Sequence, residues 1–528
     1  MSATKEWSGG LRAAWLVLLL GLAVRLVLSA RFNLVPDETN YWQWSRYLAL
    51  GYQDHPPMIA WTIWLSTHLF GQNEFAVRLP SVLGLTLASF YITLMAARWF
   101  SGRVAFHVAV LSQGILLFNG AALIATPDGL LLPCWAGACY HAGQALKDNR
   151  FRQWLFTGIW FGLGLLSKYT IVLFLPSLLL CVIFIKSYRR RLFQAAPWLG
   201  LLLSFVIFIP VIIWNSNNEW ATFRHVLYMG GIDVRSFLTW KYIGDFLLVE
   251  TALLSPLVLL LIVAAWLTGW RGRGTGTDDV SYLIWTSLTT FLAFLLLSFH
   301  SRVYGNWPAP AYLSAIVLIA ALYSPGRLDP GRWPSLTNRV WLLAVFTAYL
   351  MTVPVLVQVV VPVLPISVKL DRTARETIGW NRLGRVVHQV FGTMPRPDRT
   401  FIFGLRYQIA SELAFYVPGQ PRTVAINRWG RPNVYDFWFD DSMLRGQDGV
   451  GVTKSRDSLR QLRQVFARVE LARELPVYRD SPLRGLEKVE TFYIYRAYDF
   501  KGGQRWRPRI RDDIRATKQR AAVSPPSP

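Results

Sequence analysis

The sequence predicts a polytopic α-helical membrane protein with a small α/β domain near its C-terminal end. Of its 528 residues, 53% are hydrophobic, and the mean hydropathy of +0.30 is high for a soluble protein. Many apolar stretches reach about 18 residues or more, the length that crosses the hydrocarbon core of a bilayer as a helix. A membrane β-barrel would instead show alternating segments of about ten residues. The 24 Trp residues fit many crossings of the membrane interface, where Trp is favoured.

Eleven membrane spans are expected from these apolar runs. The first is interpreted as an uncleaved helix, because no small-residue cleavage site stands out behind it. The spans are placed at about residues 12–31, 80–99, 104–123, 129–146, 153–167, 170–186, 195–214, 243–269, 281–299, 309–323 and 339–361.

Basic residues set the expected orientation. With the N-terminus in the cytoplasm, every short inside loop is basic, as in the segment from Lys186 to Arg191, and the positive-inside rule is satisfied. The formal net charge of +24 has the same explanation, and because it is spread over loops and a tail we expect no nucleic-acid partner. The outer face then receives residues 32–79, 124–128, 168–169, 215–242, 300–308 and everything after about 362.

Composition divides the chain into three parts: a transmembrane domain at 1–365, an extracytoplasmic α/β domain at 366–500, and a basic, disordered tail at 501–528. In the α/β domain we expect an amphipathic helix at 407–416 and strands at 401–404, 423–426 and 492–495.

The first outer loop, residues 32–79, is expected to contain two short helices, from Asn40 to Leu50 and from Pro57 to Phe70. Gly51 and Pro56 separate them. Four Trp residues suggest that both helices lie in the interface plane: Trp42, Trp44, Trp61 and Trp64.

An adjacent acidic pair, Asp37 and Glu38, follows the first span and is the sharpest chemical signal in the chain. A carboxylate at the membrane edge can take a proton from an attacking hydroxyl, or hold a divalent cation. It can also be a helix signature, with Asp37 capping the helix that follows Pro36. The two interpretations are compatible, with Asp37 catalytic and Glu38 structural.

Two further polar turns are expected on the same face. In the first, Asp54 and His55 precede two prolines, so His55 can donate to a phosphate while Asp54 orients it, or the segment is a plain turn before a helix. In the second, Asp128 opens a membrane helix after Pro127, where the helix dipole alone favours an acid. A second acid at the same site would tune Asp37 or share a divalent cation with it.

Candidate phosphate ligands are the basic and hydroxyl side chains near the outer face. Lys168, beside Tyr169, interrupts an apolar stretch, where a Lys is costly unless it snorkels or pairs. Arg78 stands before the second span and binds either a phosphate or a lipid headgroup. The outer loop at 300–308 contributes His300, Arg302, Tyr304 and the possible interface anchor Trp307.

Several familiar catalytic motifs are absent from the sequence. It contains no HExxH, no GxxxxGK[ST] and no GxSxG, which argues against a zinc protease, a P-loop ATPase and an α/β-hydrolase. An activated donor must therefore arrive in another form, such as already attached to a lipid.

At these residues the chain resembles the GT-C fold glycosyltransferases that use lipid-linked sugars, in the branch of the protein O-mannosyltransferases and aminoarabinose lipid A transferases. The resemblance covers residues 1–170, and residues 407–416 are similar to the outer domain of bacterial members of this group. It rests on Pro36-Asp37-Glu38, Tyr41, Trp44, Asp54-His55-Pro56-Pro57, Ala76-Val77-Arg78-Leu79-Pro80, Thr126-Pro127-Asp128 and Ser167-Lys168-Tyr169. It implies that Asp37 is catalytic and that Asp128 matches the family's acid after the third span. The aminoarabinose enzyme looks to have Lys where this chain has His55, so the donor sugar stays open, as does a metal.

The resemblance implies an inverting transfer of a sugar from a polyprenyl-phosphate carrier to an envelope acceptor at the periplasmic side of a bacterial inner membrane. The acceptor is expected to be lipid A or another glycolipid, with core oligosaccharide and a protein hydroxyl as alternatives. Glu38, Tyr41, Asp54, His55, Arg78, Lys168, Tyr169, His300, Arg302 and Tyr304 are the expected substrate-binding residues. Two functions of other classes stay open: a transporter of a lipid-linked or anionic solute, whose polar sites should lie at mid-membrane on broken helices, and a non-catalytic scaffold.

Overall fold

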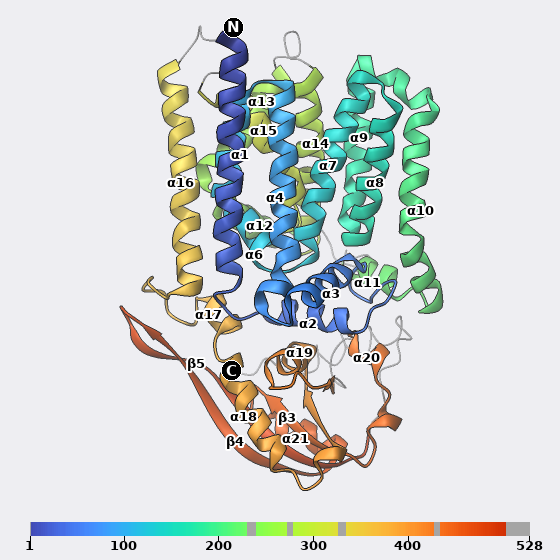
Figure 1. Ribbon diagram of the computed structural model, residues 1–528, viewed down its shortest axis with the longest axis vertical. Helices are drawn as coiled ribbons and strands as arrows, with labels where there is room; N and C mark the ends of the chain where they lie inside the picture. The colour runs from blue at the N-terminus through green and yellow to red at the C-terminus, as the bar shows by residue number, and fades with distance from the viewer. Residues whose placement is uncertain (1, 230–238, 272–277, 326–333, 427–432, 503–528) are drawn as a thin grey trace. The chain divides into compact units, whose positions relative to one another are not determined.

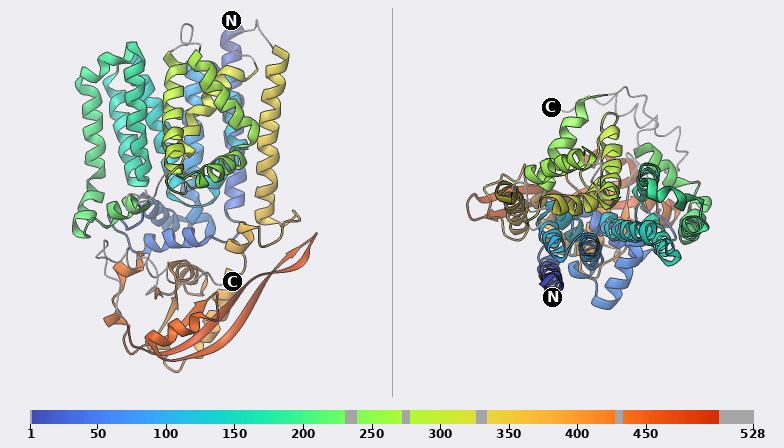
Figure 2. Two further views of the ribbon diagram at one scale, coloured as in Figure 1. Left: turned by 180° about the vertical axis from the view of Figure 1, so that it is seen from behind. Right: turned by 90° about the horizontal axis from the view of Figure 1, so that it is seen from above.

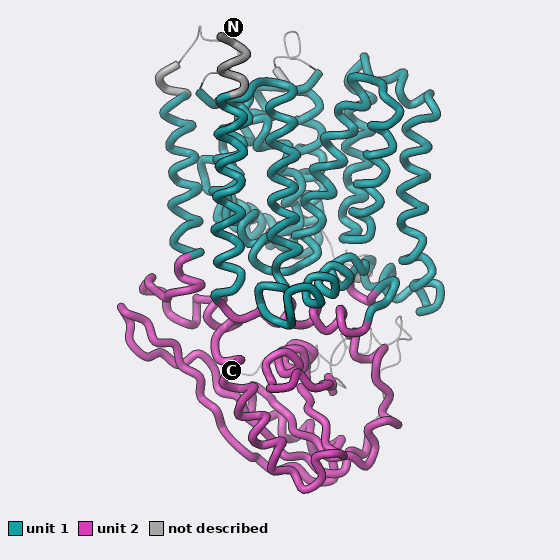
Figure 3. The backbone as a smooth tube through the Cα atoms, in the orientation of Figure 1, with its two compact units in different colours: residues 1–31, 48–51, 55–356 teal, residues 32–47, 52–54, 357–528 magenta. Residues whose placement is uncertain are grey.

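The computed structural model describes residues 2–229, 239–271, 278–325, 334–426 and 433–502. Backbone contacts divide the chain into two compact units (Figure 3). Unit 1 comprises residues 1–31, 48–51 and 55–356, and unit 2 comprises 32–47, 52–54 and 357–528. The expected disordered tail falls, from residue 503 on, outside the described residues.

Unit 1 is a bundle of helices (Figures 1 and 2). Its α-helices are α1 (Ser2–Ser29), α3 (Met58–Phe70), α4 (Glu74–Trp99), α5 (Gly102–Gly114), α6 (Leu116–Leu123), α7 (Pro127–Asp148), α8 (Phe151–Ser167), α9 (Phe174–Phe184), α10 (Ala195–Asn217), α11 (Ala221–Met229), α12 (Lys241–Leu254), α13 (Pro256–Arg271), α14 (Asp278–Ser298), α15 (Ala309–Tyr323) and α16 (Pro334–Val360), the last of which runs into unit 2. Two 3-10 helices, η1 (Tyr169–Leu173) and η2 (Lys186–Phe193), flank α9.

The described helices include five that are long and apolar enough to cross a membrane, or up to eight if each bent pair counts as one span. The five are α1, α4, α10, α14 and α16. The bent pairs are α5 with α6 at 66°, η1–α9 with η2 at 117°, and α12 with α13 at 106°. Each of the eleven predicted spans coincides with one of these or with α7, α8 or α15, so the helices are where the sequence placed them, while the number that cross the membrane stays a prediction.

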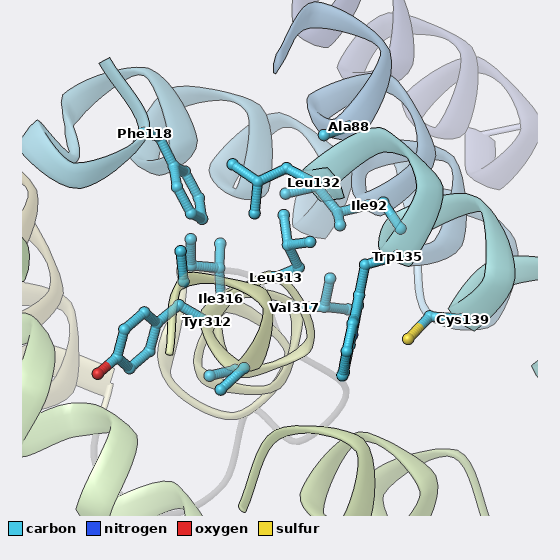
Figure 4. Close-up of a cluster of buried hydrophobic side chains, with 14 of the residues drawn as sticks. Ala88, Ile92, Phe118, Leu132, Trp135, Cys139, Tyr312, Leu313, Ile316 and Val317 are labelled. Carbon is cyan, nitrogen blue, oxygen red and sulfur yellow. The ribbon is translucent and has the colours of Figure 1, made fainter. Parts of the chain in front are cut away.

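The core of unit 1 forms around α15, whose residues from Ala309 to Ala320 are all buried. A helix that is apolar on every side is stable only when other helices surround it. In Figure 4, Ile316 of α15 lies next to Phe118 of α6, and Val317 of α15 lies next to Trp135 of α7. This packing holds α7 and α15 in the same bundle.

Unit 2 contains a mixed five-stranded sheet with helices. Its helices are α2 (Pro36–Arg46), α17 (Arg372–Thr377), α18 (Trp380–Gly392), η3 (Pro397–Arg399), α19 (Tyr407–Tyr416), α20 (Tyr435–Trp438), η4 (Asp441–Met443) and α21 (Ser458–Val465). Its strands are β1 (Thr400–Gly404), β2 (Thr423–Ala425), β3 (Asp448–Thr453), β4 (Phe466–Ser481) and β5 (Gly485–Phe500). The order is β2-β1-β3-β5-β4, with β1 parallel to β2 and β3, and with β5 antiparallel to β3 and β4.

The segment that carries the acidic pair packs within unit 2, which the sequence did not indicate. The Leu34 amide donates to the Tyr416 hydroxyl at 2.7 Å, and the Gln43 amide donates to the Tyr435 hydroxyl at 3.1 Å. The prediction that Trp42 and Trp44 are interface anchors is wrong, because their side chains are only 1% and 0% exposed. They stack instead inside the unit, Trp42 edge-on to Phe415 and Trp44 on Tyr52.

Candidate functional site

The most compact polar cluster in unit 1 joins the start of α7 to the end of α8. Asp128 lies in the first turn of α7, as predicted, and Lys168 is the C-cap residue that directly follows α8. The Lys168 Nζ donates to the Asp128 Oδ1 at 2.7 Å. The two helix ends are tied a second time, because the Ser167 hydroxyl donates to the Pro127 carbonyl at 2.8 Å.

A third residue of the cluster, Asn306, lies in the loop between α14 and α15. The Asn306 side-chain amide donates to the Asp128 Oδ2 at 2.7 Å, so both carboxylate oxygens of Asp128 are occupied. Sequence reasoning placed Asn306 in an outer loop but did not select it. The signal that was available is its position directly before Trp307 and Pro308, at the start of the buried helix α15.

The Asp128–Lys168 ion pair is buried, so each charge depends on the other for its stability. Its side chains are only 5% and 8% exposed. Charges taken out of water are tolerated when they are paired and hydrogen-bonded, and losing one partner is then strongly destabilising. Of the two alternatives expected for Lys168, snorkelling or pairing, the structure shows pairing, and the partner is the Asp128 carboxylate.

The remaining predicted residues of the 300–308 loop lie closer to solvent. The Arg302 side chain is exposed, with its guanidinium carbon 5.9 Å from the centre of the Tyr304 ring. Tyr304, 48% exposed, lies 5.5 Å from Trp307, ring centre to ring centre. His300 is partly buried, and Tyr169, next to Lys168, packs its ring against Phe223. Arg302, which shares a loop with Asn306, is therefore accessible to an anionic group.

A buried acid that sequence reasoning missed, Glu250, lies on the bent span formed by α12 and α13. Its side chain is fully buried, and its Oε2 accepts from the Tyr312 hydroxyl at 2.8 Å. The Glu250 carboxylate lies close to the loop that carries Asn306, because a Cβ at Gly305 would stand 3.6 Å from the Glu250 Oε1. Two acids, Asp245 and Glu250, interrupt the apolar run 243–269, and an acid in such a run was the available signal.

The acidic pair of the first outer loop lies in unit 2. The α2 helix begins at Pro36 and has Val35 as its N-cap, so the interpretation of Asp37 as a cap is wrong. Glu38 caps the start of the helix instead. Its fully buried side chain accepts a hydrogen bond from the Val35 backbone amide at 2.9 Å. The Asp37 side chain is exposed and therefore accessible to a substrate.

Other predicted ligands are distributed over both units. Tyr41 is 8% exposed in α2 and packs edge-on to Trp44. Asp54 belongs to unit 2 and His55 to unit 1, both partly buried. Arg78 is fully buried in α4, where its Nη1 donates to the Ser29 carbonyl at 3.0 Å, at the end of α1.

The convergence of Asp37 with the Asp128 cluster stays a prediction, since the two belong to different units. Within unit 2, burial raises the pKa of Tyr435, whose hydroxyl anchors α2 through Gln43. Among the described residues, no group of three or more His, Cys, Asp or Glu side chains is arranged to hold a metal ion.

Comparisons with known proteins agree with this architecture. The sequence profile of the dolichyl-phosphate-mannose-protein mannosyltransferase family matches residues 54–214. The lipid A galacturonosyltransferase RgtD of Rhizobium johnstonii is 23% identical over 57% of this chain and 64% of its own length. The undecaprenyl phosphate-alpha-4-amino-4-deoxy-L-arabinose arabinosyl transferase of Edwardsiella ictaluri is 26% identical over 58% of this chain and 59% of its own. The chain thus spans somewhat under two thirds of the length of these relatives.

A solved structure extends the likeness to nearly the whole chain. ArnT from Cupriavidus metallidurans, bound to undecaprenyl phosphate, superposes with a TM-score of 0.63 at 16% identity and covers 93% of this chain and 99% of its own. The fold is therefore that of ArnT, and the resemblance to the GT-C glycosyltransferases is confirmed. With its apolar helices, the chain is an integral membrane protein.

Proposed function

We propose that this protein is an inverting glycosyltransferase that moves a sugar from a polyprenyl-phosphate carrier to lipid A or another glycolipid of the envelope. The observation that carries the proposal is the buried Asp128–Lys168 pair with Asn306 at adjoining helix ends, in a fold shared with ArnT. The relatives add the chemistry, because their names specify undecaprenyl phosphate-linked donors and lipid A.

In the proposed reaction, Asp37 and the Asp128 cluster have different roles. The acceptor hydroxyl attacks C1 of the sugar, and the exposed carboxylate of Asp37 takes its proton. The carrier phosphate leaves with the bonding electrons, and its charge is stabilised by Lys168, Arg302 and His55. Asp128 holds Lys168 in place before the donor binds. If the acceptor is itself a phosphate, no base is needed, and Asp37 orients it or holds a cation. Arg78 contacts the end of α1, which favours a supporting role for it.

We further propose the topology that the sequence predicts. Eleven spans with a cytoplasmic N-terminus put residues 366–500 and the catalytic loop at 32–79 on the periplasmic side of the inner membrane. The transmembrane domain then ends near residue 365, and the tail from 501 follows the α/β domain.

A protein acceptor is the second candidate, because the matching profile carries the name of protein mannosyltransferases. Mass spectrometry of lipid A, core oligosaccharide and membrane proteins from cells with and without the gene separates the two. A sugar increment lost only from the lipid supports the proposal, and one lost only from proteins supports the second candidate. If neither changes while a lipid-linked solute accumulates on one side of the membrane, the bent spans point to a transporter.

A further inference from the structure

An apolar cavity lies in unit 1, and none of the residues that line it belongs to the Asp128 cluster. It has a volume of about 400 Å³ and is bounded by α8, α9, η2 and α10. Its wall includes Trp154, Gly158, Phe161, Phe174, Leu178 and Trp198. The volume is in the range of about 300–1,000 Å³ that is typical of ligand sites, and the wall is almost wholly hydrocarbon.

Arg191 is the charged residue at this cavity. Its Nε donates to the Leu146 carbonyl at 3.2 Å, while its two Nη groups have no hydrogen-bond partner among the residues that the structure describes. A guanidinium fork with open donors is suited to a phosphate, which it can bind through two parallel hydrogen bonds.

The element that carries Arg191 has the character of a membrane-interface segment. Three more cations on η2, Lys186, Arg189 and Arg190, are exposed. Phe193 is 91% exposed, and apolar rings beside cations are typical of elements that lie at the headgroup level.

The acids that face η2 offset only part of this charge. Asp278, whose one described partner on η2 is the neutral Ser187 hydroxyl at 2.6 Å, offsets one of the four cations, whereas Asp279 is already paired with the Lys147 ammonium at 2.7 Å. The cavity therefore combines a hydrocarbon-lined interior with a cationic mouth.

We propose that this cavity is a binding site for an anionic glycerophospholipid of the surrounding bilayer, with one acyl chain in the cavity and the phosphate on Arg191. The donor carrier is a poorer candidate, because Lys168, the proposed phosphate residue, lies 14 positions beyond Trp154 along α8. At a rise of 1.5 Å per residue, Lys168 is about 21 Å along the helix axis from Trp154, which lines the cavity together with Arg191.

The test uses the full-length protein, delipidated in a neutral detergent and titrated with phosphatidylglycerol or phosphatidylcholine during native mass spectrometry. We expect phosphatidylglycerol to bind with a preference of about fivefold or more, since cations at the headgroup level favour anionic lipid. Arg191→Gln should remove this preference. Arg190→Gln is the matched control, because it removes an equal charge from the same element at a residue that does not line the cavity.

Leu201→Trp keeps the charge and fills the cavity, and it should weaken retention of both lipids by a similar factor. Equal binding of the two lipids to the wild type, or equal loss in both Arg variants, would overturn the proposal. Competition experiments with inorganic phosphate and with undecaprenyl phosphate identify which phosphate compound the site binds. Displacement of the lipid by equimolar inorganic phosphate, or one-for-one displacement by undecaprenyl phosphate at lower concentration, would also overturn it.

Discussion

The buried pair of Asp128 and Lys168 offers a quantitative test of the site. Their charged atoms are 2.7 Å apart and their side chains are 5% and 8% exposed. Replacing Asp128 by Asn or Lys168 by Met leaves a buried charge without its counter-charge, and each change should lower the free energy of unfolding by about 3–5 kcal/mol. The double variant buries no charge, so its loss should be smaller than the sum of the two single losses by about 2–3 kcal/mol.

The assay is reversible unfolding by dodecyl sulfate in mixed micelles, followed by far-ultraviolet circular dichroism. A matched control is available in the same unit: Lys147 and Asp279 are also 2.7 Å apart, but their side chains are 32% and 14% exposed. Solvent screening should reduce the coupling of that pair to about 1 kcal/mol or less. If the Asp128–Lys168 cycle is additive to within about 0.5 kcal/mol, the two residues do not act as a buried ion pair, and the reasoning is refuted.

Three further predictions concern unit 2. Asp37→Asn should abolish sugar transfer in a radiolabelled-donor assay while the melting temperature stays unchanged, because the side chain is exposed; full activity would end its assignment as base. Glu487 accepts from Arg479 at 2.6 Å, and this contact holds its pKa below the ordinary value. The contact therefore stabilises the folded state above the ordinary Glu pKa of about 4.3, and this stabilisation is lost as the pH falls through the lowered pKa of the folded state. Glu487→Gln should flatten the acid side of the plot of unfolding free energy against pH. An unchanged plot would contradict this. Gly384→Ala should cost about 1–3 kcal/mol, because the new methyl meets a backbone carbonyl of α19, whereas Gly392→Ala, with nothing within 4 Å of its Cβ, should be tolerated on thermal melting.

Elements with a strong local signal were predictable from the sequence. The α19 helix was placed from Tyr407 to Tyr416, the bounds that the structure has, because Pro418 and Gly419 stop it. The apolar runs likewise located the membrane helices, and Pro127 marked the start of α7. In each case a residue with restricted or permissive backbone geometry fixes one end of the element.

Long-range packing set the outcomes that local patterns did not predict. Trp42 and Trp44 have the amphipathic rings expected at a membrane interface, but unit 2 buries them. The β4 and β5 strands, each of 16 residues, are stabilised by pairing with each other, and only residues 492–495 in the middle of β5 stood out in the sequence. Glu250 and Asn306 bond to residues 62 and 178 positions away, a separation that no single-sequence pattern encodes.

The most direct test of sugar transfer is a reconstituted reaction. Purified protein in liposomes receives polyprenyl-phosphate sugar extracted from the native membrane together with lipid A, and both lipids are followed by mass spectrometry. We predict that lipid A gains one sugar mass for each polyprenyl phosphate released, with inverted configuration at C1. Release without a glycosylated lipid, transfer only to a protein, or an intact donor after prolonged incubation would contradict the account.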